Sequence, residues 1–169
     1  DQTGQADWGY NAISNGGNTP NTWRTLTGGF NGEWDYVFNT RSTSSGIRYA
    51  KAQVLGVNGV ILLPDDWSSS YYSLSNTNNG SASFGSNVIS SSNWANNLQS
   101  HGAVFLPAAG YRRNGTSVND AGTGGFYWSS MCFDSDLACS LLFIRGNVYP
   151  QNGDGRCSGF SVRLVCPAE

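Results

Sequence analysis

Hydrophobic positions alternate with small or polar ones in two segments near the end of the chain, residues 125–130 and 159–165. A period of two is typical of a β-strand that buries one face. Between these segments, residues 132–158 show little periodicity, so the sequence predicts a rigid frame around an irregular, chemically mixed surface. The strands predicted from this alternation and from apolar runs are residues 52–55, 59–63, 103–106, 125–130, 140–144 and 160–165.

Two segments have the spacing of an amphipathic helix. Trp34, Val37 and Phe38 fall at i, i+3 and i+4, and Arg41 continues the stripe at i+7. The second helix follows the cap-like serines 90–92 and places Trp94 and Leu98 one turn apart. Two early helices before a run of strands predict the α+β class, with two short helices packed on a small, mostly antiparallel sheet with long loops. Large apolar side chains should anchor its core, namely Trp34, Trp94, Phe126 and Trp128.

Length and charge limit the possible classes of protein. A chain of 169 residues with 6 Trp, 8 Tyr and 8 Phe suits one domain with a core, over residues 1–169. Only 12% of the residues are charged, the net charge is −2, and no basic stripe is present, which argues against a nucleic-acid partner. No apolar run approaches the roughly 20 residues of a membrane span, so we expect no membrane insertion by this domain.

The first residue and the cysteines indicate the cellular setting. The chain opens at Asp1 without an initiator methionine or a signal-peptide pattern, so we expect the C-terminal domain of a longer protein. Few Lys and Glu beside abundant Asn, Ser, Thr, Tyr and Trp favour an extracellular, cell-surface or phage-virion protein. Cys132, Cys139, Cys157 and Cys166 permit disulfides but match no paired Cys-x-x-Cys zinc pattern, and their disulfide state stays open.

Several sequence blocks together carry a family resemblance. Trp-Arg-Thr-Leu-Thr at residues 23–27 and Glu-Trp-Asp-Tyr-Val-Phe-Asn-Thr-Arg at residues 33–41 begin the series. It continues at residues 60–67, 102–110, 127–130 and 159–165. These blocks resemble C-type-lectin-like domains of the formylglycine-generating-enzyme type, including secreted or phage-borne proteins of gut bacteria. The resemblance runs from about residue 8 to residue 165 and implies that fold for nearly the whole chain.

Residues 132–158 are similar to the hypervariable region of diversity-generating retroelement variable proteins. In that family an error-prone reverse transcriptase mutates template adenines, so Asn codons yield a set of residues without Lys, Gln, Glu, Met and Trp. Only Gln151 lies outside that set, fewer than the whole-chain composition would give. Cys132, Cys139 and Cys157 would then arise from mutagenesis. The diversified positions that the resemblance implies are Phe133, Asp134, Asp136, Leu137, Cys139, Ser140, Leu142, Ile144, Arg145, Tyr149, Asp154, Gly155, Cys157 and Ser158.

The resemblance implies a non-enzymatic module that binds an unknown protein or glycan on a cell surface, for phage tropism or cell-surface recognition. Leu141 and Phe143 should point inward while Leu142 and Ile144 point outward. The outward pair should join Phe133 and Tyr149 in an exposed apolar patch with a charged rim. Such a variant would bind weakly and gain from multivalent display. The alternatives are a carbohydrate-binding lectin of fixed specificity and a formylglycine-generating oxidase.

Candidate metal-binding and catalytic residues are few. The aspartates of residues 132–158 are candidate calcium ligands, but the Glu-Pro-Asn, Gln-Pro-Asp and Trp-Asn-Asp motifs of sugar-binding C-type lectins are absent. The cysteines do not fall in the copper-binding pair of formylglycine-generating enzymes. His101 follows the second predicted helix, where it suits the helix C-terminus, and Asp65 and Asp66 suit the end of a strand. We therefore expect no catalytic residue, no metal and no cofactor.

Overall fold

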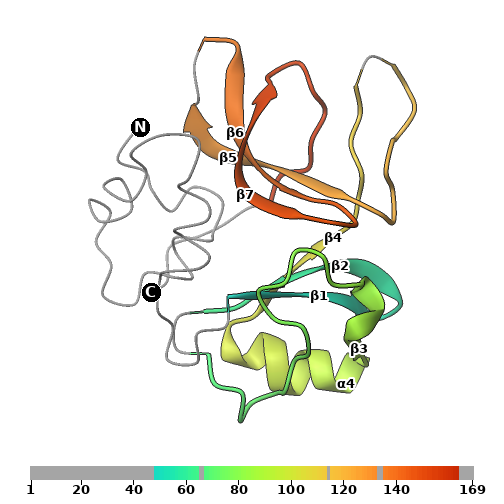
Figure 1. Cartoon of the computed structure of the whole chain (residues 1–169), viewed down its shortest axis with the longest axis vertical. Coiled ribbons are helices and arrows are strands. Elements are labelled where there is room, and N and C mark those ends of the chain that lie inside the picture. Colours follow the sequence, from blue (N-terminus) through green and yellow to red (C-terminus); the bar gives the residue numbers. More distant parts are fainter. Residues whose placement is uncertain (1–47, 65–66, 114, 133–134, 164–169) are drawn as a thin grey trace.

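The computed structural model describes residues 48–64, 67–113, 115–132 and 135–163. Its strands form two sheets, one above the other in Figure 1. The four-stranded sheet has the order β3-β1-β2-β4, and only its β1–β3 pair is parallel. The three-stranded sheet is antiparallel in chain order, β5-β6-β7. The strands are β1 (Tyr49–Val54), β2 (Val57–Leu62), β3 (Val88–Ile89), β4 (Val104–Pro107), β5 (Gly125–Cys132), β6 (Leu137–Phe143) and β7 (Val148–Gly155).

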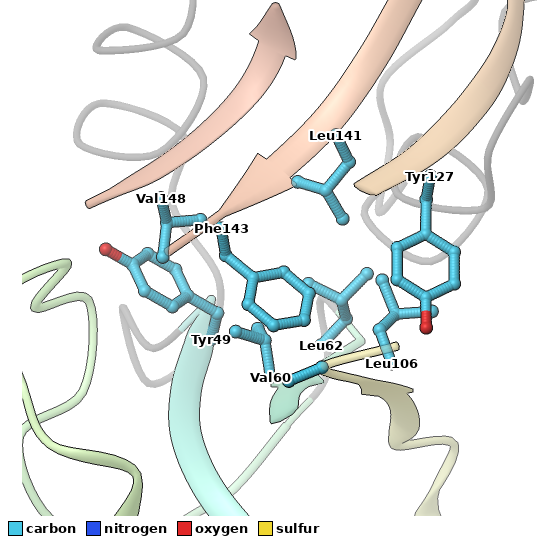
Figure 2. Close-up of a cluster of buried hydrophobic side chains, with 9 residues drawn as sticks. Tyr49, Val60, Leu62, Leu106, Tyr127, Leu141, Phe143 and Val148 are labelled. Atoms are coloured by element: carbon cyan, nitrogen blue, oxygen red, sulfur yellow. The ribbon is translucent and has the colours of Figure 1, made fainter. Parts of the chain in front are cut away.

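An apolar core fills the space between the two sheets, as Figure 2 shows. Side chains of both sheets point into it, because residues two apart in a strand project from the same face. Phe143 is 0% exposed and stacks on Tyr127, with 6.3 Å between their ring centroids. This core therefore joins the sheets into one unit. Its members in Figure 2 are Tyr49, Val60, Leu62 and Leu106 from the four-stranded sheet and Tyr127, Leu141, Phe143 and Val148 from the three-stranded sheet.

A second core lies on the opposite face of the four-stranded sheet. Ile61 and Leu63 point into it, and Trp67 and Leu98 cover them from a loop and a helix. All four side chains are 0% exposed to solvent. The described residues therefore stack in three layers, with the helix and the loop below, the four-stranded sheet in the middle and the three-stranded sheet above.

One helix of 11 residues runs along the lower layer. It comprises α4 (Ser91–Asn93), the π-helical turn η2 (Trp94–Leu98) and the 3₁₀ turn η3 (Gln99–His101). Ser90 caps it, since its Oγ accepts a hydrogen bond from the Asn93 N–H at 3.2 Å. Gly102, with φ of 81°, ends it. The prediction of a serine-capped helix that places Trp94 and Leu98 against the core is confirmed.

The predicted α+β architecture is wrong for the part of the chain that the structure describes. That part is mostly β, with 40% strand, two sheets and this single short helix, so it is not a pair of helices on one small sheet. The first predicted helix, with Trp34, lies outside the described residues. The two short amphipathic patterns were given the same weight as the many strand patterns, although, within the described residues, seven strands of two to eight residues form both sheets around the core.

Five predicted strands match β1, β2, β4, β5 and β6, with shifts at their ends. The strand β7 was missed because Val148–Gly155 contains Pro, Asn, Asp and two Gly, which are poor strand formers. Its pairing with β6 across a short turn overrides that weak local preference. The segment that the sequence predicted to be irregular therefore contains a hairpin.

The predicted strand over residues 160–165 is only partly described. Ser161 lies alongside β5, where its N–H donates to the Phe126 carbonyl at 2.9 Å and its carbonyl accepts from the Trp128 N–H at 3.0 Å. Gly159 forms a bridge with Arg112 in the same region. The outer edge of β5 is therefore covered by main-chain hydrogen bonds from this segment.

The turn between β1 and β2 holds a strained leucine. Leu55 and Gly56 have φ of 53° and 80°, which two-residue hairpin turns require, but a leucine side chain disfavours positive φ. Leu55 is 61% exposed, so little packing offsets this strain. We expect Leu55→Asn to raise the free energy of unfolding by about 1 kcal/mol, measured by urea denaturation. Leu55→Val, which is β-branched, should lower it, and equal stability of the two variants would contradict this reading of the turn.

Candidate functional site

The hairpin of β6 and β7 carries most of the positions predicted to vary. Leu141 pairs with Tyr127 of β5, and both lie with Phe143 in the core between the sheets. Leu142 and Ile144, which alternate with these residues, are partly exposed. The predicted alternation, with Leu141 and Phe143 inward and Leu142 and Ile144 outward, therefore agrees with the structure.

The predicted variable positions fall into four groups by exposure. Ten of them reach the surface at least in part, on or beside this hairpin. The exposed ones are Asp136, Arg145 and Cys157; the half-buried ones are Leu137, Leu142, Ile144, Tyr149, Asp154, Gly155 and Ser158; the buried ones are Cys139 and Ser140; and Phe133 and Asp134 lie outside the described residues.

Cys139 and Ser140, both predicted to face outward at the surface, are buried. Cys139 is 2% exposed and shares the inward face of β6 with Leu141, because the two are two residues apart. Ser140 is on the outer face but is 0% exposed, and its hydroxyl donates to Asp154 Oδ2 at 2.7 Å. Cys139 is therefore a core residue, whereas Ser140 is buried beneath polar neighbours.

The outer face of β5 carries an aromatic cluster that the sequence did not predict. Trp128 and Phe126, expected in the core, lie on the face opposite to Tyr127, which belongs to the core between the sheets. Phe126 is buried as predicted, at 8% exposed, whereas Trp128 is half-buried. The Phe160 ring stacks on Trp128 with 4.4 Å between centroids and 26° between planes, and it lies 5.2 Å from Phe126. Tyr111 adds a ring 4.4 Å from Phe126. Residues 126–128 are all aromatic, so hydrophobicity alone could not distinguish the two faces of this strand.

The turn between β6 and β7 is held through its main-chain carbonyls. Lys51 of β1 is 0% exposed. Its Nζ donates to the carbonyl oxygens of Gly80, Ile144 and Arg145 at 2.5, 2.6 and 3.0 Å. Because all three acceptors are main-chain atoms, this anchoring does not depend on which side chains stand at positions 144 and 145.

Lys51 is matched to its site as a cation. Three carbonyl oxygens equal the number of N–H donors on an ammonium group, and the Phe84 ring lies 5.4 Å from Nζ. Burial lowers the pKa of Lys51 to about 8, so the ammonium form still predominates at neutral pH. Sequence reasoning missed this residue, although a signal existed: the only lysine of the chain lies inside an apolar strand.

The opposite end of the hairpin is anchored in the same way. The Arg156 Nε donates to the Leu137 carbonyl at 3.2 Å, and the Arg156 N–H donates to the Asp136 carbonyl at 3.1 Å. The Ser158 N–H donates to the Gly155 carbonyl at 2.9 Å. These acceptors belong to positions predicted to vary, and again only their main-chain atoms are used.

Residues 66–165 match the model of a family described as Domain of unknown function (DUF8237). The match covers more than half of the chain. The chain belongs to the DUF8237 family. No curated protein and no solved structure matches it. The DUF8237 match includes the helix and the strands from β3 to β7, but it begins after β1 and β2, which are the central strands of the four-stranded sheet.

Within the DUF8237 match, His101 lies in the last turn of the helix. Its Nδ1 is 3.2 Å from the Asn97 carbonyl oxygen, and its ring stacks on Tyr71 with 4.0 Å between centroids. The prediction that His101 interacts with the helix C-terminus is therefore confirmed. Asp65 and Asp66 lie outside the described residues.

Cysteines and carboxylates are the remaining candidates for metal binding in the part of the chain that the structure describes. Cys157 carries a free, exposed thiol. Among the residues that the structure describes, no three His, Cys, Asp or Glu side chains gather as they would around a metal ion. Within the same residues, no helix has the length and apolar character needed to cross a membrane.

Proposed function

We propose that the outer face of the β5-β6-β7 sheet, with the β6–β7 turn, is a non-enzymatic binding surface for a protein or glycan on a cell surface. Retroelement mutagenesis would diversify this surface. The observation that carries the proposal is the division of the hairpin into two faces. Leu141 and Phe143 fill the core, whereas Leu142 and Tyr149, paired across β6 and β7, are half-buried on the other face. Side chains on the outer face can therefore change without altering the core.

The anchoring of the hairpin supports the same proposal. Lys51 holds the turn and Arg156 holds the far end through carbonyl oxygens, which every residue type supplies. A frame built on main-chain acceptors keeps its shape when outward side chains are replaced. Sequence diversity would then change the surface chemistry and leave the backbone unchanged.

Binding by this face would use a few apolar anchors. Leu142 pairs with Phe126 on one side and Tyr149 on the other, which places a row of apolar side chains across the sheet. Ile144, half-buried, follows Leu142 by two residues along the chain, and the exposed Arg145 comes next in the turn. An apolar centre with charged residues at its edge is the usual anatomy of an interface. An individual variant would bind weakly and gain affinity through multivalent display on a virion or cell surface.

A matched pair of substitutions tests whether the outer face tolerates change. We expect Leu141→Ala to lower the free energy of unfolding by about 3 kcal/mol, because it opens a cavity in the core. Leu142→Ala, the same change one residue later, should cost less than about 1 kcal/mol, because that side chain is partly exposed. Urea denaturation of both variants gives the comparison. Equal losses would contradict a tolerant outer face.

The genomic locus tests the diversification. We expect a near-copy of the segment for residues 132–158 downstream of the gene, with Asn-type codons at the diversified positions, beside a reverse transcriptase gene. Sibling sequences should differ at outward positions such as Leu142 and Tyr149 and agree at Leu141 and Phe143. A complete locus without the near-copy and the reverse transcriptase would remove the retroelement from the proposal.

Binding itself is tested separately. A tetramer of the chain is applied to a panel of purified cell-surface proteins and immobilised glycans. Leu142→Asp and Tyr149→Asp should each weaken any binding by at least about tenfold, because they place a charge at the apolar centre. Leu55→Asn, at the far hairpin, is the control. Binding that is unchanged in both aspartate variants would exclude this face.

A further inference from the structure

The outer face of the three-stranded sheet carries a row of one aromatic and two polar side chains. Trp128 of β5 pairs with Ser140 of β6, and Ser140 pairs with Asn152 of β7. Directly opposed residues of antiparallel strands project from the same face, so these side chains are neighbours. Two strand spacings, roughly 10 Å, separate Trp128 from Asn152.

Asp154 organises the polar end of this row. Its Oδ2 accepts hydrogen bonds from Ser140 Oγ and from Asn152 Nδ2, both at 2.7 Å. Both donors use the same carboxylate oxygen, so neither of them engages Oδ1. The Asn152 amide, oriented by its own donation, keeps its carbonyl oxygen as a second acceptor. Asp154 and Asn152 are half-buried, whereas Ser140 beneath them is 0% exposed. The polar end is therefore a preorganised pair of acceptors at the surface.

Trp128, at the aromatic end of the row, is also held in place by its neighbours. Phe160 stacks on Trp128 with 4.4 Å between ring centroids. The neighbouring Ser161 joins the main chain of β5 at both Phe126 and Trp128, which sets the position of the Phe160 ring. Trp128 is half-buried, so it is held in place while part of the indole stays accessible.

We propose that Trp128, Ser140, Asn152 and Asp154, here called the glycan row, bind a neutral glycan. A sugar ring presents C–H groups on one face and hydroxyl groups around its edge. It therefore suits a flat aromatic surface beside convergent hydrogen-bond acceptors. The ring stacks on Trp128, and its hydroxyls donate to Asp154 and Asn152.

This inference rests on the proposed function, because it uses the same face as the binding surface, and it adds the class of ligand. Trp128 precedes residues 132–158, whereas Ser140 and Asp154 are among the positions proposed to vary. The aromatic part of the glycan row would therefore be common to sibling proteins. The polar part would differ between them and set which sugar is preferred.

A lysine or arginine side chain of a partner protein is the main competing ligand, because a carboxylate beside an aromatic ring also suits a cation. The surrounding charge argues against it. Arg145 in the β6–β7 turn and Arg156 just after β7 are both exposed on the hairpin that carries the row. These cations would repel an approaching lysine or arginine, whereas a neutral glycan meets no such barrier.

An array of immobilised neutral oligosaccharides, probed with a tetramer of the full chain, tests the inference. We expect the chain to bind at least one neutral glycan. This binding should change little between about 0.1 and 0.5 M salt, a range over which the electrostatic screening length roughly halves. Trp128→Ala and Asp154→Ala should each lower the apparent affinity by at least about tenfold. Trp128→Phe, which keeps an aromatic ring, should retain most of the binding. Val88→Ala, on the edge of the other sheet, should leave it unchanged.

Two results would overturn the inference. One is that the chain binds no neutral glycan, and the other is that binding survives both Trp128→Ala and Asp154→Ala. Salt-sensitive binding of a lysine-rich peptide that Asp154→Asn abolishes would assign the row to a cation instead. Thermal melting confirms that each variant is folded, and Asp154→Ala keeps the test valid if Trp128→Ala unfolds. The proposed function fails separately, if sibling genes differ at Leu141 and Phe143 as often as at Leu142 and Tyr149.

Discussion

Replacing Gly125 with alanine is expected to lower the free energy of unfolding by about 3 kcal/mol, a large part of the stability of a small domain. Gly125 opens β5 opposite Phe143 of β6, and the Phe143 ring lies across it. A Cβ atom at Gly125 would stand 2.1 Å from Phe143 Cζ and 2.4 Å from Cε1, too close for any real contact. Phe143 is 0% exposed within the core between the sheets, so its ring has no space into which to move.

A control and a rescue separate this steric effect from the ordinary cost of replacing glycine. A Cβ at Gly146, in the turn between β6 and β7, meets nothing within 4 Å, so Gly146→Ala should change stability by less than about 0.5 kcal/mol. Phe143→Leu shortens the side chain, so adding it to Gly125→Ala should cost less than the sum of the two single changes. Urea denaturation measures all four variants. A Gly125→Ala midpoint equal to that of the wild type would mean that Phe143 does not lie over β5.

The sequence predicted most strands because their hydrophobic runs are local signals. β7 was missed because its pairing with β6 is a tertiary effect that overrides poor local preference. The faces of β5 were misassigned for a different reason. Residues 126–128 are all aromatic, so alternation gave no contrast, and only the packing of Phe160 on Trp128 and of Tyr127 in the core distinguishes the two faces.

The inward and outward positions of the candidate site were predictable from the sequence, whereas the long-range hydrogen bonds that hold the site in place were not. The alternation of Leu141, Leu142 and Phe143 is visible in the sequence because a strand has a period of two. The bond from Lys51 to Ile144 joins residues 93 positions apart, and no local pattern indicates such a contact. The burial of Ser140 depends likewise on Asp154, 14 positions away, through a side-chain hydrogen bond.

Replacing Lys51 with methionine is expected to lower the free energy of unfolding by about 3 kcal/mol at pH 7. Methionine keeps much of the length and volume of the lysine side chain, so the change removes chiefly the hydrogen bonds. The carbonyls of Gly80, Ile144 and Arg145 would each lose a charged donor, at about 1 kcal/mol each because they are only partly buried. The turn that carries Ile144 and Arg145 would also lose its link to β1. Binding through the proposed surface should therefore weaken together with stability.

The pH dependence of the same pair of proteins identifies the lysine as the cause. Burial lowers the pKa of Lys51 to about 8 in the folded chain, below its unfolded value of about 10.4. The unfolded chain therefore binds the proton more tightly, so this group raises stability as the pH rises from 8 to 10, by about 2 kcal/mol. Burial raises the pKa of Tyr49 and Tyr127 to about 12, so their contribution falls only as the pH rises above about 10.

The difference between the wild type and Lys51→Met removes the tyrosine contribution, because both proteins contain Tyr49 and Tyr127. The stability gap should widen between pH 8 and pH 10, since only the wild type gains from losing the buried proton. As Lys51 is the only lysine of the chain, NMR titration of its ε-CH₂ group gives its pKa without overlap from other lysines. A pKa near 10.4, with a gap that does not change with pH, would mean that the folded chain does not penalise the ammonium and would contradict the lowered pKa. A pKa near 8 with a widening gap would confirm that the Lys51 amine is buried in the opposite sheet, next to the β6–β7 turn of the proposed binding surface.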